Sequence, residues 1–201
     1  MYVSHLNRKS NLTLIHALFV LLLLGAFWKA MADEPLPSPN SYTTCSSNGT
    51  FCIELVPGSD GRLFRKGPDG KRTNLWSMPG WHRAVFVSDD GHHLVKCYDG
   101  LNLIPPNFDP NMSLIEVWRD GALTHRLSVR AVVGDLSTMV RTVSHYLWGD
   151  CRGFESVARF ALATKTRDPD SPKDRPRLLE RKLVLNVQTG ELTRTNEVTR
   201  F

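Results

Sequence analysis

The sequence lacks the short motifs that identify the common catalytic and cofactor sites. It has no Gly-x-Ser-x-Gly turn around a serine nucleophile, no His-Glu-x-x-His zinc motif and no Gly-rich phosphate loop. Its Asp-Gly pairs lack the alternating acids and the distant Glu of a calcium loop. We therefore predict no metal and no cofactor, and no motif assigns a catalytic residue.

Excess charge is also scarce once the first residues are set apart. Lys and Arg number 25 against 20 acids, but residues 1–32 hold three of the basic residues and no acid. The remainder therefore carries a net charge of only +2. Such a balance gives no reason to expect a nucleic-acid partner.

Long apolar runs are confined to the N-terminus. Arg8 and Lys9 precede an apolar run over 17–28, and a small-x-small pattern ends at Ala32. This order predicts a secretory signal peptide over residues 1–32. An uncleaved membrane anchor is the alternative, although the run is shorter than the ~20 residues that span a bilayer. We expect an exported protein, periplasmic or secreted, with no membrane contact after cleavage and a flexible lead-in over 33–41.

Cysteine is rare, and none of the four residues forms a Cys-x-x-Cys pair. An even number in an oxidising compartment favours two disulfides over free thiols or a zinc site. Four cysteines allow three connectivities. If Asn48-Gly49 is a two-residue hairpin turn, Cys45 lies directly opposite Cys52, at a separation that a disulfide tolerates. This register favours Cys45–Cys52 and leaves Cys97 with Cys151.

What the sequence does contain is a series of glycine turns between short apolar runs. Within 84–129, Asp90-Gly91 and Asp120-Gly121 each separate two runs of strand length, the pattern of a β-hairpin. Similar hairpins are predicted within 42–76 and over 179–195. Their likeness indicates three degenerate copies of a β-meander, although hairpins also resemble one another without any repeat.

Only one stretch has helical periodicity. Apolar residues recur at helical spacing between Val129 and Val143, which predicts one short amphipathic helix. Further strands are expected over 143–147 and 157–163. Proline-bearing loops are expected over 100–110 and 165–177. The predicted fold is mainly β, an antiparallel meander with one short helix, in a single domain over 42–201.

The stretch Val87-Ser88-Asp89-Asp90-Gly91-His92-His93-Leu94-Val95 resembles the blade repeat of β-propeller proteins. The similarity is to the Ser-Pro-Asp-Gly type of bacterial exported and envelope proteins, including the propeller of the Tol system. It covers 42–129 and, more faintly, 178–195. The resemblance implies four-stranded meanders that usually serve as binding platforms. Asp89 replaces the usual proline, no Trp-Asp pair closes a repeat, and the chain is short for a full ring. A partial propeller or an open twisted sheet is the expected form.

Two polar pairs are the candidates for chemistry. The turn at Asp120-Gly121 would place Glu116 opposite His125, and a carboxylate beside an imidazole can shift a pKa. The turn at Asp90-Gly91 would place Ser88 opposite His93, which suggests nucleophilic catalysis only if an orienting acid and an oxyanion hole accompany the pair. A structural ion pair and a serine bonded to its own turn explain the same residues more simply.

Aromatic side chains are the candidates for ligand binding. The set comprises Trp76, Trp81, Trp118 and Trp148. Trp81 and His82 follow Pro79-Gly80 in a connection between two units, where binding residues often lie, so these two are the predicted binding residues. Core packing is the alternative for most of the set.

The sequence therefore predicts a non-catalytic binding or interaction module of the cell envelope, with an envelope protein or a glycan as its partner. One alternative is an envelope hydrolase that uses Glu116 with His125, or Ser88 with His93. The other is a structural accessory subunit that pairs with a partner through a sheet edge.

Overall fold

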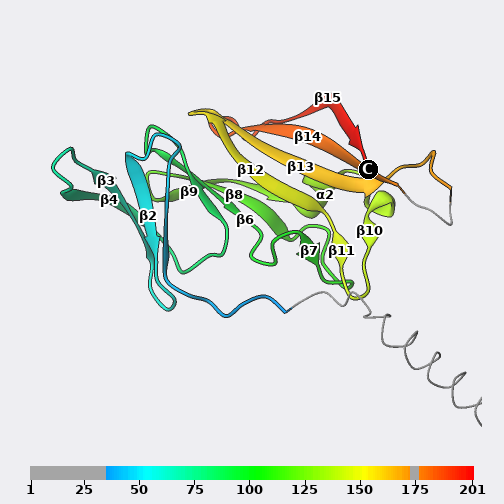
Figure 1. Ribbon diagram of the computed structural model, residues 1–201, viewed down its shortest axis with the longest axis horizontal. Coiled ribbons are helices and arrows are strands. Elements are labelled where there is room, and N and C mark those ends of the chain that lie inside the picture. The colour runs from blue at the N-terminus through cyan, green and yellow to red at the C-terminus, as the bar shows by residue number, and fades with distance from the viewer. Residues whose placement is uncertain (1–34, 173–176) are drawn as a thin grey trace, which may run out of the picture. The chain divides into compact units, whose positions relative to one another are not determined.

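Antiparallel sheets account for most of the chain in the computed structural model, which describes residues 35–172 and 177–201 (Figure 1). The predicted signal peptide, residues 1–32, lies outside these ranges. Among the described residues, no helix is both long and apolar enough to cross a membrane. The prediction of a mainly β fold with one short helix is confirmed.

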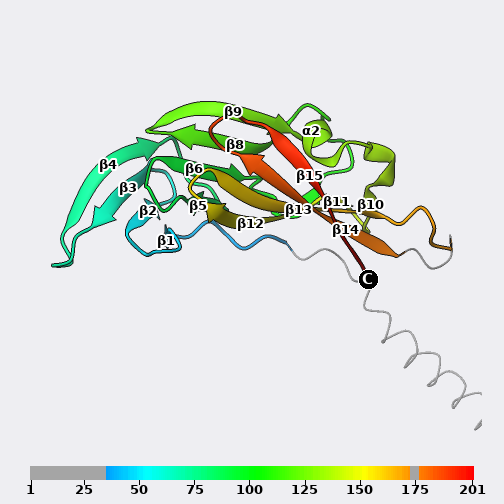
Figure 2. The ribbon, with the colours of Figure 1, turned by 90° about the horizontal axis from the view of Figure 1, so that it is seen from above.

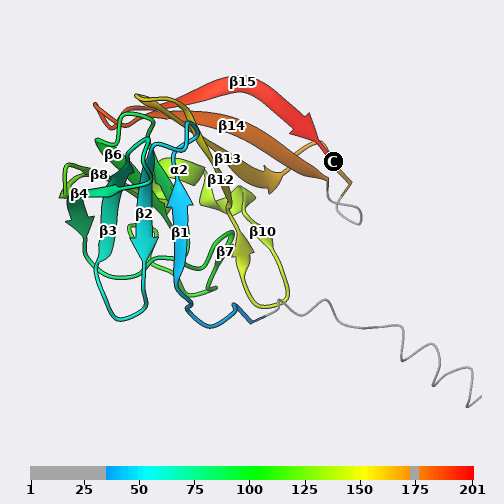
Figure 3. The same cartoon turned by 60° about the vertical axis from the view of Figure 1, so that its left-hand side comes forward.

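The first sheet is a four-stranded meander in the order β1-β2-β3-β4, whose strands lie side by side in Figure 3. Its strands are β1 (Tyr42–Cys45), β2 (Phe51–Leu55), β3 (Gly61–Lys66) and β4 (Arg72–Met78). Gly49 adopts a positive φ of 72° in the first turn, a conformation that costs glycine little. The turn places Cys45 opposite Cys52, as predicted.

The second sheet has the same simple topology, in the order β5-β6-β8-β9. Its strands are β5 (Val85–Val87), β6 (His93–Cys97), β8 (Ser113–Arg119) and β9 (Ala122–Ser128). Val87 pairs with Leu94, and the Ser88 amide donates to the His93 carbonyl at 3.0 Å. The predicted hairpin register about Asp90-Gly91 is confirmed.

The β8–β9 hairpin contains a bulge that the turn sequence does not reveal. Trp118 pairs with Leu123 as expected, but the next pair is Val117 with His125, which leaves Thr124 as the extra residue. A bulge shifts every later pair by one residue. Glu116 therefore lies opposite Arg126, and the predicted pairing of Glu116 with His125 is wrong.

The third sheet has longer strands, in the order β12-β13-β14-β15. They are β12 (Gly149–Ser156), β13 (Arg159–Arg167), β14 (Leu178–Asn186) and β15 (Leu192–Arg200). The strand expected over 157–163 begins only at Arg159, because Val157 and Ala158 form the turn between β12 and β13. The final hairpin, expected over 179–195, extends to Arg200.

The predicted helix ends earlier than its periodicity suggests. Helix α2 spans Val129–Val133, and the Ser128 hydroxyl oxygen caps it by accepting from the Ala131 amide at 3.2 Å. Gly134 leaves the helix with a positive φ of 82°, and a 3-10 turn follows at Leu136–Thr138. The later apolar residues belong to other structure.

Residues 140–147 instead contribute two strands to a small three-stranded sheet. Its strands are β10 (Val140–Arg141), β11 (Tyr146–Leu147) and β7 (Leu103–Ile104), in that order. Strand β7 lies inside the loop predicted over 100–110. Long-range pairing has thus overridden the local helical pattern after residue 138 and the loop signal before Pro105.

The second sheet lies between the first and the third (Figures 1 and 2). Because side chains alternate along a strand, Leu94 packs toward the first sheet and Val95 toward the third. The smaller apolar cluster contains Ile53, Leu55, Leu63, Met78, Val85, Val87 and Leu94. The larger includes Val95, Val117, Phe160, Leu162, Leu183 and Leu185. The middle sheet is therefore buried on both faces.

Both predicted disulfides are formed. Cys45–Cys52 links β1 to β2 within the first sheet, across a sequence separation of 7. Cys97–Cys151 links β6 to β12, across a separation of 54. The second bridge therefore ties the middle sheet covalently to the third.

Candidate functional site

Ser88 contacts the backbone of His93 and not its ring, so the two do not form a catalytic pair. The Ser88 hydroxyl is bonded to the Asp90 carboxylate, and its oxygen accepts from the His93 amide at 3.0 Å. The His93 ring is 3% exposed, and neither ring nitrogen has a hydrogen-bond partner. Burial lowers the pKa of His93. Ser88 is thus a turn residue, as the simpler interpretation of the sequence has it.

Because of the bulge, Glu116 and His125 do not face each other, and they contact different residues. The Glu116 carboxylate lies 3.3 Å from the Lys96 ammonium and 3.7 Å from Arg126. His125 Nε2 lies 3.2 Å from the Gln188 carbonyl of the third sheet. The two residues therefore form no acid–base pair.

Trp81 and His82 lie in the connection between β4 and β5, as predicted, where both are tied to structural partners. Trp81 Nε1 donates to the Asn40 carbonyl at 2.8 Å, and its ring meets the Tyr42 ring edge-on at 6.3 Å. His82 Nδ1 lies 3.1 Å from the Asp99 carboxylate. Burial raises the pKa of Tyr42 to about 12. This group anchors the connection against the second sheet.

The remaining tryptophans divide between core and surface. Trp148 is 1% exposed and donates to the Leu101 carbonyl at 2.6 Å, so it is a core residue. Trp118 packs against the smaller apolar cluster. Trp76 is half-buried and lines a cavity of about 480 Å³. Of the four predicted candidates, Trp76 is therefore the one that the fold places at an accessible cavity.

This cavity is a cleft between the first and second sheets. Its walls are Phe51, Arg65, Leu75 and Trp76 from the first sheet and Asp90, Gly91, His92 and Asp120 from the second. It combines two aromatic rings and an aliphatic side chain with four ionisable groups. Binding pockets typically have this character, a largely apolar surface with a few polar groups that orient the ligand.

Contacts between side chains and backbone groups join the first sheet to the turn at Asp89, Asp90 and Gly91 and hold the cleft together. A Cβ on Gly91 would lie 2.3 Å from Cδ1 of Phe51, so only glycine lets the ring lie this close. Trp76 Nε1 donates to the Gly91 carbonyl at 3.2 Å. The Asn48 amide donates to the Asp89 carboxylate at 2.8 Å. Both aromatic rings are thus positioned by the second sheet before any ligand binds.

The polar rim of the cleft has a defined charge pattern. His92 Nδ1 lies 2.8 Å from Asp120 Oδ1, and this hydrogen bond raises the pKa of His92. Burial opposes ionisation of Asp90, but bonds from the Ser88 hydroxyl and the His92 amide outweigh it and lower the pKa of Asp90. Arg65 has no ion pair with any described residue. The rim therefore presents carboxylates and an unneutralised guanidinium.

Sequence reasoning identified one residue of this cleft and missed most of the others. Trp76 belonged to the aromatic set, whereas Asp90 and Asp120 were taken only as turn residues. Phe51 and Leu75 occur in ordinary strand patterns that carry no functional signal. The missing information is which strand end of the first sheet meets which turn of the second, and no local pattern encodes it.

Comparison with known proteins adds no assignment. No family model matches the chain, and no curated protein matches it. Among solved structures, hydrazine synthase from Kuenenia stuttgartiensis is similar at a TM-score of 0.38 and 11% sequence identity. The similarity covers 76% of this chain and 40% of that chain. A likeness this low supports no conclusion about fold or function.

Proposed function

We propose that this chain is a non-catalytic binding module of the cell envelope, and that the cleft between its first two sheets takes a glycan. The observation that carries the proposal is the pairing of Phe51 and Trp76 with the carboxylates of Asp90 and Asp120 in one cavity of about 480 Å³. A sugar ring has an apolar C–H face and a rim of hydroxyl groups. An aromatic ring suits the first, and carboxylates suit the second.

The polar contacts support binding in preference to hydrolysis. The Ser88 hydroxyl is bonded to the Asp90 carboxylate, and neither nitrogen of the buried His93 ring has a hydrogen-bond partner. Glu116 is neutralised by Lys96 and Arg126. Neither predicted pair has the nucleophile–base contact that covalent catalysis requires.

Two further features support export. The two disulfides are the kind that persist in an oxidising compartment. Residues 1–32 have the order of a secretory signal. The resemblance to propeller blade repeats agrees with a binding role, because such meanders usually serve as platforms.

The proposal is tested by titrating the chain with soluble tetrasaccharides of N-acetylglucosamine, glucose and mannose, followed by calorimetry and tryptophan fluorescence. We expect one of these sugars to bind and to change the Trp76 emission. Replacing Trp76 with Ala should weaken binding by about fivefold or more, because an aromatic contact contributes about 1 kcal/mol beyond its area.

A pair of aspartates provides the matched comparison. Asp120 and Asp69 both precede glycine in hairpin turns, but only Asp120 lines the cleft. Asn tolerates the left-handed conformation that Asp120 adopts at a φ of 48°. Asp120→Asn should therefore weaken sugar binding while Asp69→Asn should not. Equal affinities for the Trp76→Ala variant and the parent chain would refute the placement of the ligand.

A further inference from the structure

The Cys45–Cys52 disulfide lies on the outer face of the first sheet, the face turned away from the second sheet. Ile53 and Leu55 point inward into the smaller apolar cluster, so their neighbour Cys52 points outward. Cys45 and Phe64 pair with Cys52 across the two adjacent strands and share its face. The bridge is therefore on the side of the sheet opposite to the glycan cleft.

The two sulfurs of this bridge differ in access. Cys52 is 0% exposed, whereas Cys45 is half-buried and ends β1, which is the edge strand of its sheet. Phe64 lies opposite Cys52, and the Arg72 guanidinium covers the Phe64 ring at 4.5 Å from its centroid. A reagent in solution can therefore reach Cys45 Sγ but not Cys52 Sγ.

Lys66 places a positive charge at the accessible sulfur. Its Nζ lies 3.6 Å from Cys45 Sγ, and it forms no ion pair within the described part of the chain. Lys66 follows Phe64 by two residues on β3, so both point to the outer face. A cation beside a cysteine sulfur favours the thiolate, which is the form that reacts with disulfides.

The strands around the bridge add to this charge. Arg62 and Arg72 share one acid on the outer face, Glu54, at 3.5 and 3.6 Å. Arg62 pairs with Glu54 across β2 and β3, and Lys66 pairs with Arg72 across β3 and β4, so all four point to the same side. Three cations and one carboxylate give the outer face of these strands an excess of two positive charges.

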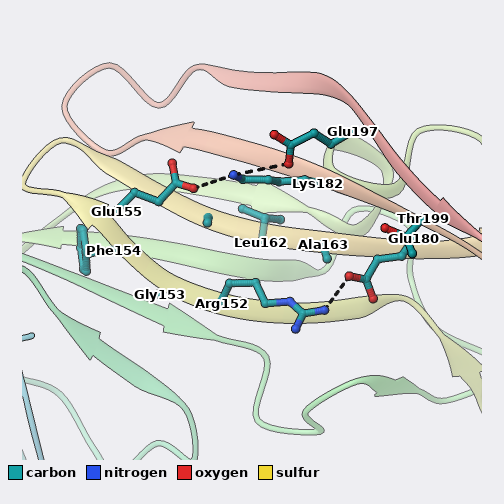
Figure 4. Close-up of a pocket in the computed structure, with 11 residues that line it drawn as sticks. Arg152, Gly153, Phe154, Glu155, Leu162, Ala163, Glu180, Lys182, Glu197 and Thr199 are labelled. Carbon is teal, nitrogen blue, oxygen red and sulfur yellow. Dashed lines mark hydrogen bonds and ion pairs between the residues drawn. The ribbon is translucent and has the colours of Figure 1, made fainter.

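The third sheet shows that a charged sheet surface in this chain can neutralise itself. Figure 4 shows a groove on that sheet in which each labelled cation contacts an acid. Arg152 lies 2.7 Å from Glu180, and Lys182 lies 2.8 Å from Glu155. Lys66, by contrast, contacts a sulfur and no carboxylate.

The second bridge has no such charge beside it. Cys97 belongs to the larger apolar cluster, and Cys151 packs against that cluster. Neither cysteine bonds to a cation among residues 35–172 and 177–201. Because both bridges join a buried cysteine to a half-buried one, the charge at the accessible sulfur is what distinguishes them. Cys97–Cys151 is thus an internal control.

We propose that Cys45–Cys52 is a site of thiol–disulfide exchange with a small anionic thiol. The partner's thiolate attacks Cys45 Sγ, the bond to Cys52 breaks, and the electron pair leaves on Cys52 Sγ, which takes a proton from water. A second partner thiolate then attacks the partner's sulfur in the mixed disulfide and releases the Cys45 thiolate beside Lys66. Two partner thiols are oxidised to one disulfide, and the protein bridge is reduced to two thiols. The glycan cleft takes no part in this reaction.

The first test treats the oxidised full chain with glutathione, which is an anionic thiol, at increasing concentrations. Samples are quenched with acid and alkylated, and the cysteines are assigned by mass spectrometry. We expect Cys45–Cys52 to open at concentrations that leave Cys97–Cys151 intact, and we expect the trapped glutathione on Cys45. Simultaneous opening of both bridges, no opening in the folded chain, or glutathione on Cys52 would overturn the proposal.

The second test removes the charge. Lys66→Gln should slow the reaction with glutathione about fivefold at low salt, because opposite unit charges about 4 Å apart attract by about that factor in water. The difference should shrink in 1 M salt, which screens charges beyond about 3 Å. Lys71→Gln, on the same hairpin but paired with Asp69 at 3.0 Å, should react like the parent.

A change of thiol separates this effect from a structural one. Cysteamine is a cationic thiol, so Lys66→Gln should not slow its reaction with the bridge. Equal slowing with cysteamine and glutathione would show that the substitution had altered the bridge itself, and it would refute the role of charge. Unchanged glutathione rates in Lys66→Gln would refute it as well.

Discussion

The two disulfides should differ in what they contribute to stability, although their chemistry is the same. Cys45–Cys52 closes a separation of 7 residues and Cys97–Cys151 one of 54. In the chain-entropy treatment, the loss of conformational freedom in the unfolded chain corresponds to about 2.4 kcal/mol for the short loop and about 4.2 kcal/mol for the long one. Removing the second bridge should therefore cost about 1.8 kcal/mol more than removing the first.

The two bridges are well matched for this comparison. Each joins one fully buried cysteine to one half-buried cysteine: Cys52 is 0% exposed and Cys97 is 3% exposed. Replacing both members of a pair with Ala removes the same atoms from similar environments, so the packing losses largely cancel in the difference.

The assay is equilibrium unfolding in urea of the parent chain and the two double alanine variants. The slope against urea should rise more for the Cys97/Cys151 variant, because its unfolded chain gains more freedom. The free energy of unfolding extrapolated to water should fall further for that variant. Equal losses, or a larger loss for the Cys45/Cys52 variant, would refute the reasoning. The second bridge would then be less important than its position between two sheets suggests.

Other perturbations test the packing and the titration. Burial lowers the pKa of His93 below its usual 6.5, so the unfolded chain takes up a proton before the folded chain does. The free energy of unfolding should therefore fall as the pH drops below about 6.5. His93→Gln should flatten this dependence in urea titrations at successive pH values. Gly149→Ala should prevent folding or lower the free energy of unfolding by more than about 4 kcal/mol, because a Cβ there would lie 1.8 Å from the Ala163 carbonyl oxygen. Thermal unfolding followed by circular dichroism measures this change. Phe160→Ala should cost about 3–5 kcal/mol in the same assay, because its side chain is 0% exposed, whereas the exposed Val198→Ala should stay within about 0.5 kcal/mol.

Turn chemistry made much of the fold predictable from sequence. Asn48-Gly49 and Asp90-Gly91 each set the register of a hairpin, and the first of them also identified the Cys45–Cys52 bridge. These inferences succeeded because a two-residue turn fixes which residues face each other without help from the rest of the chain. The mainly β class followed from the same signals.

Inference failed where distant contacts decide the local structure. The bulge at Thr124 places His125 on the face of the second sheet that packs on the third sheet. There His125 contacts the Gln188 carbonyl. The helix that begins at Val129 gives way to β10 because Met139 bridges to Thr166 and Val140 pairs with Leu147. In neither case do the neighbouring residues in the sequence contain the deciding partner.

The candidate site was the least predictable part. The cleft joins Trp76 of the first sheet with Asp90 and Asp120 of the second, and these residues come together only when the two sheets pack. Spacing along the chain could not have indicated this site.

The order of the cysteines has a consequence for how the chain matures. Each native bridge joins a cysteine to the next one along the sequence, first with second and third with fourth. Under the export proposed above, a chain that threads through a pore from its N-terminus and is oxidised as its thiols emerge would form both bridges correctly in order of emergence. On that proposal the chain needs an oxidant but no isomerase to correct misplaced pairs.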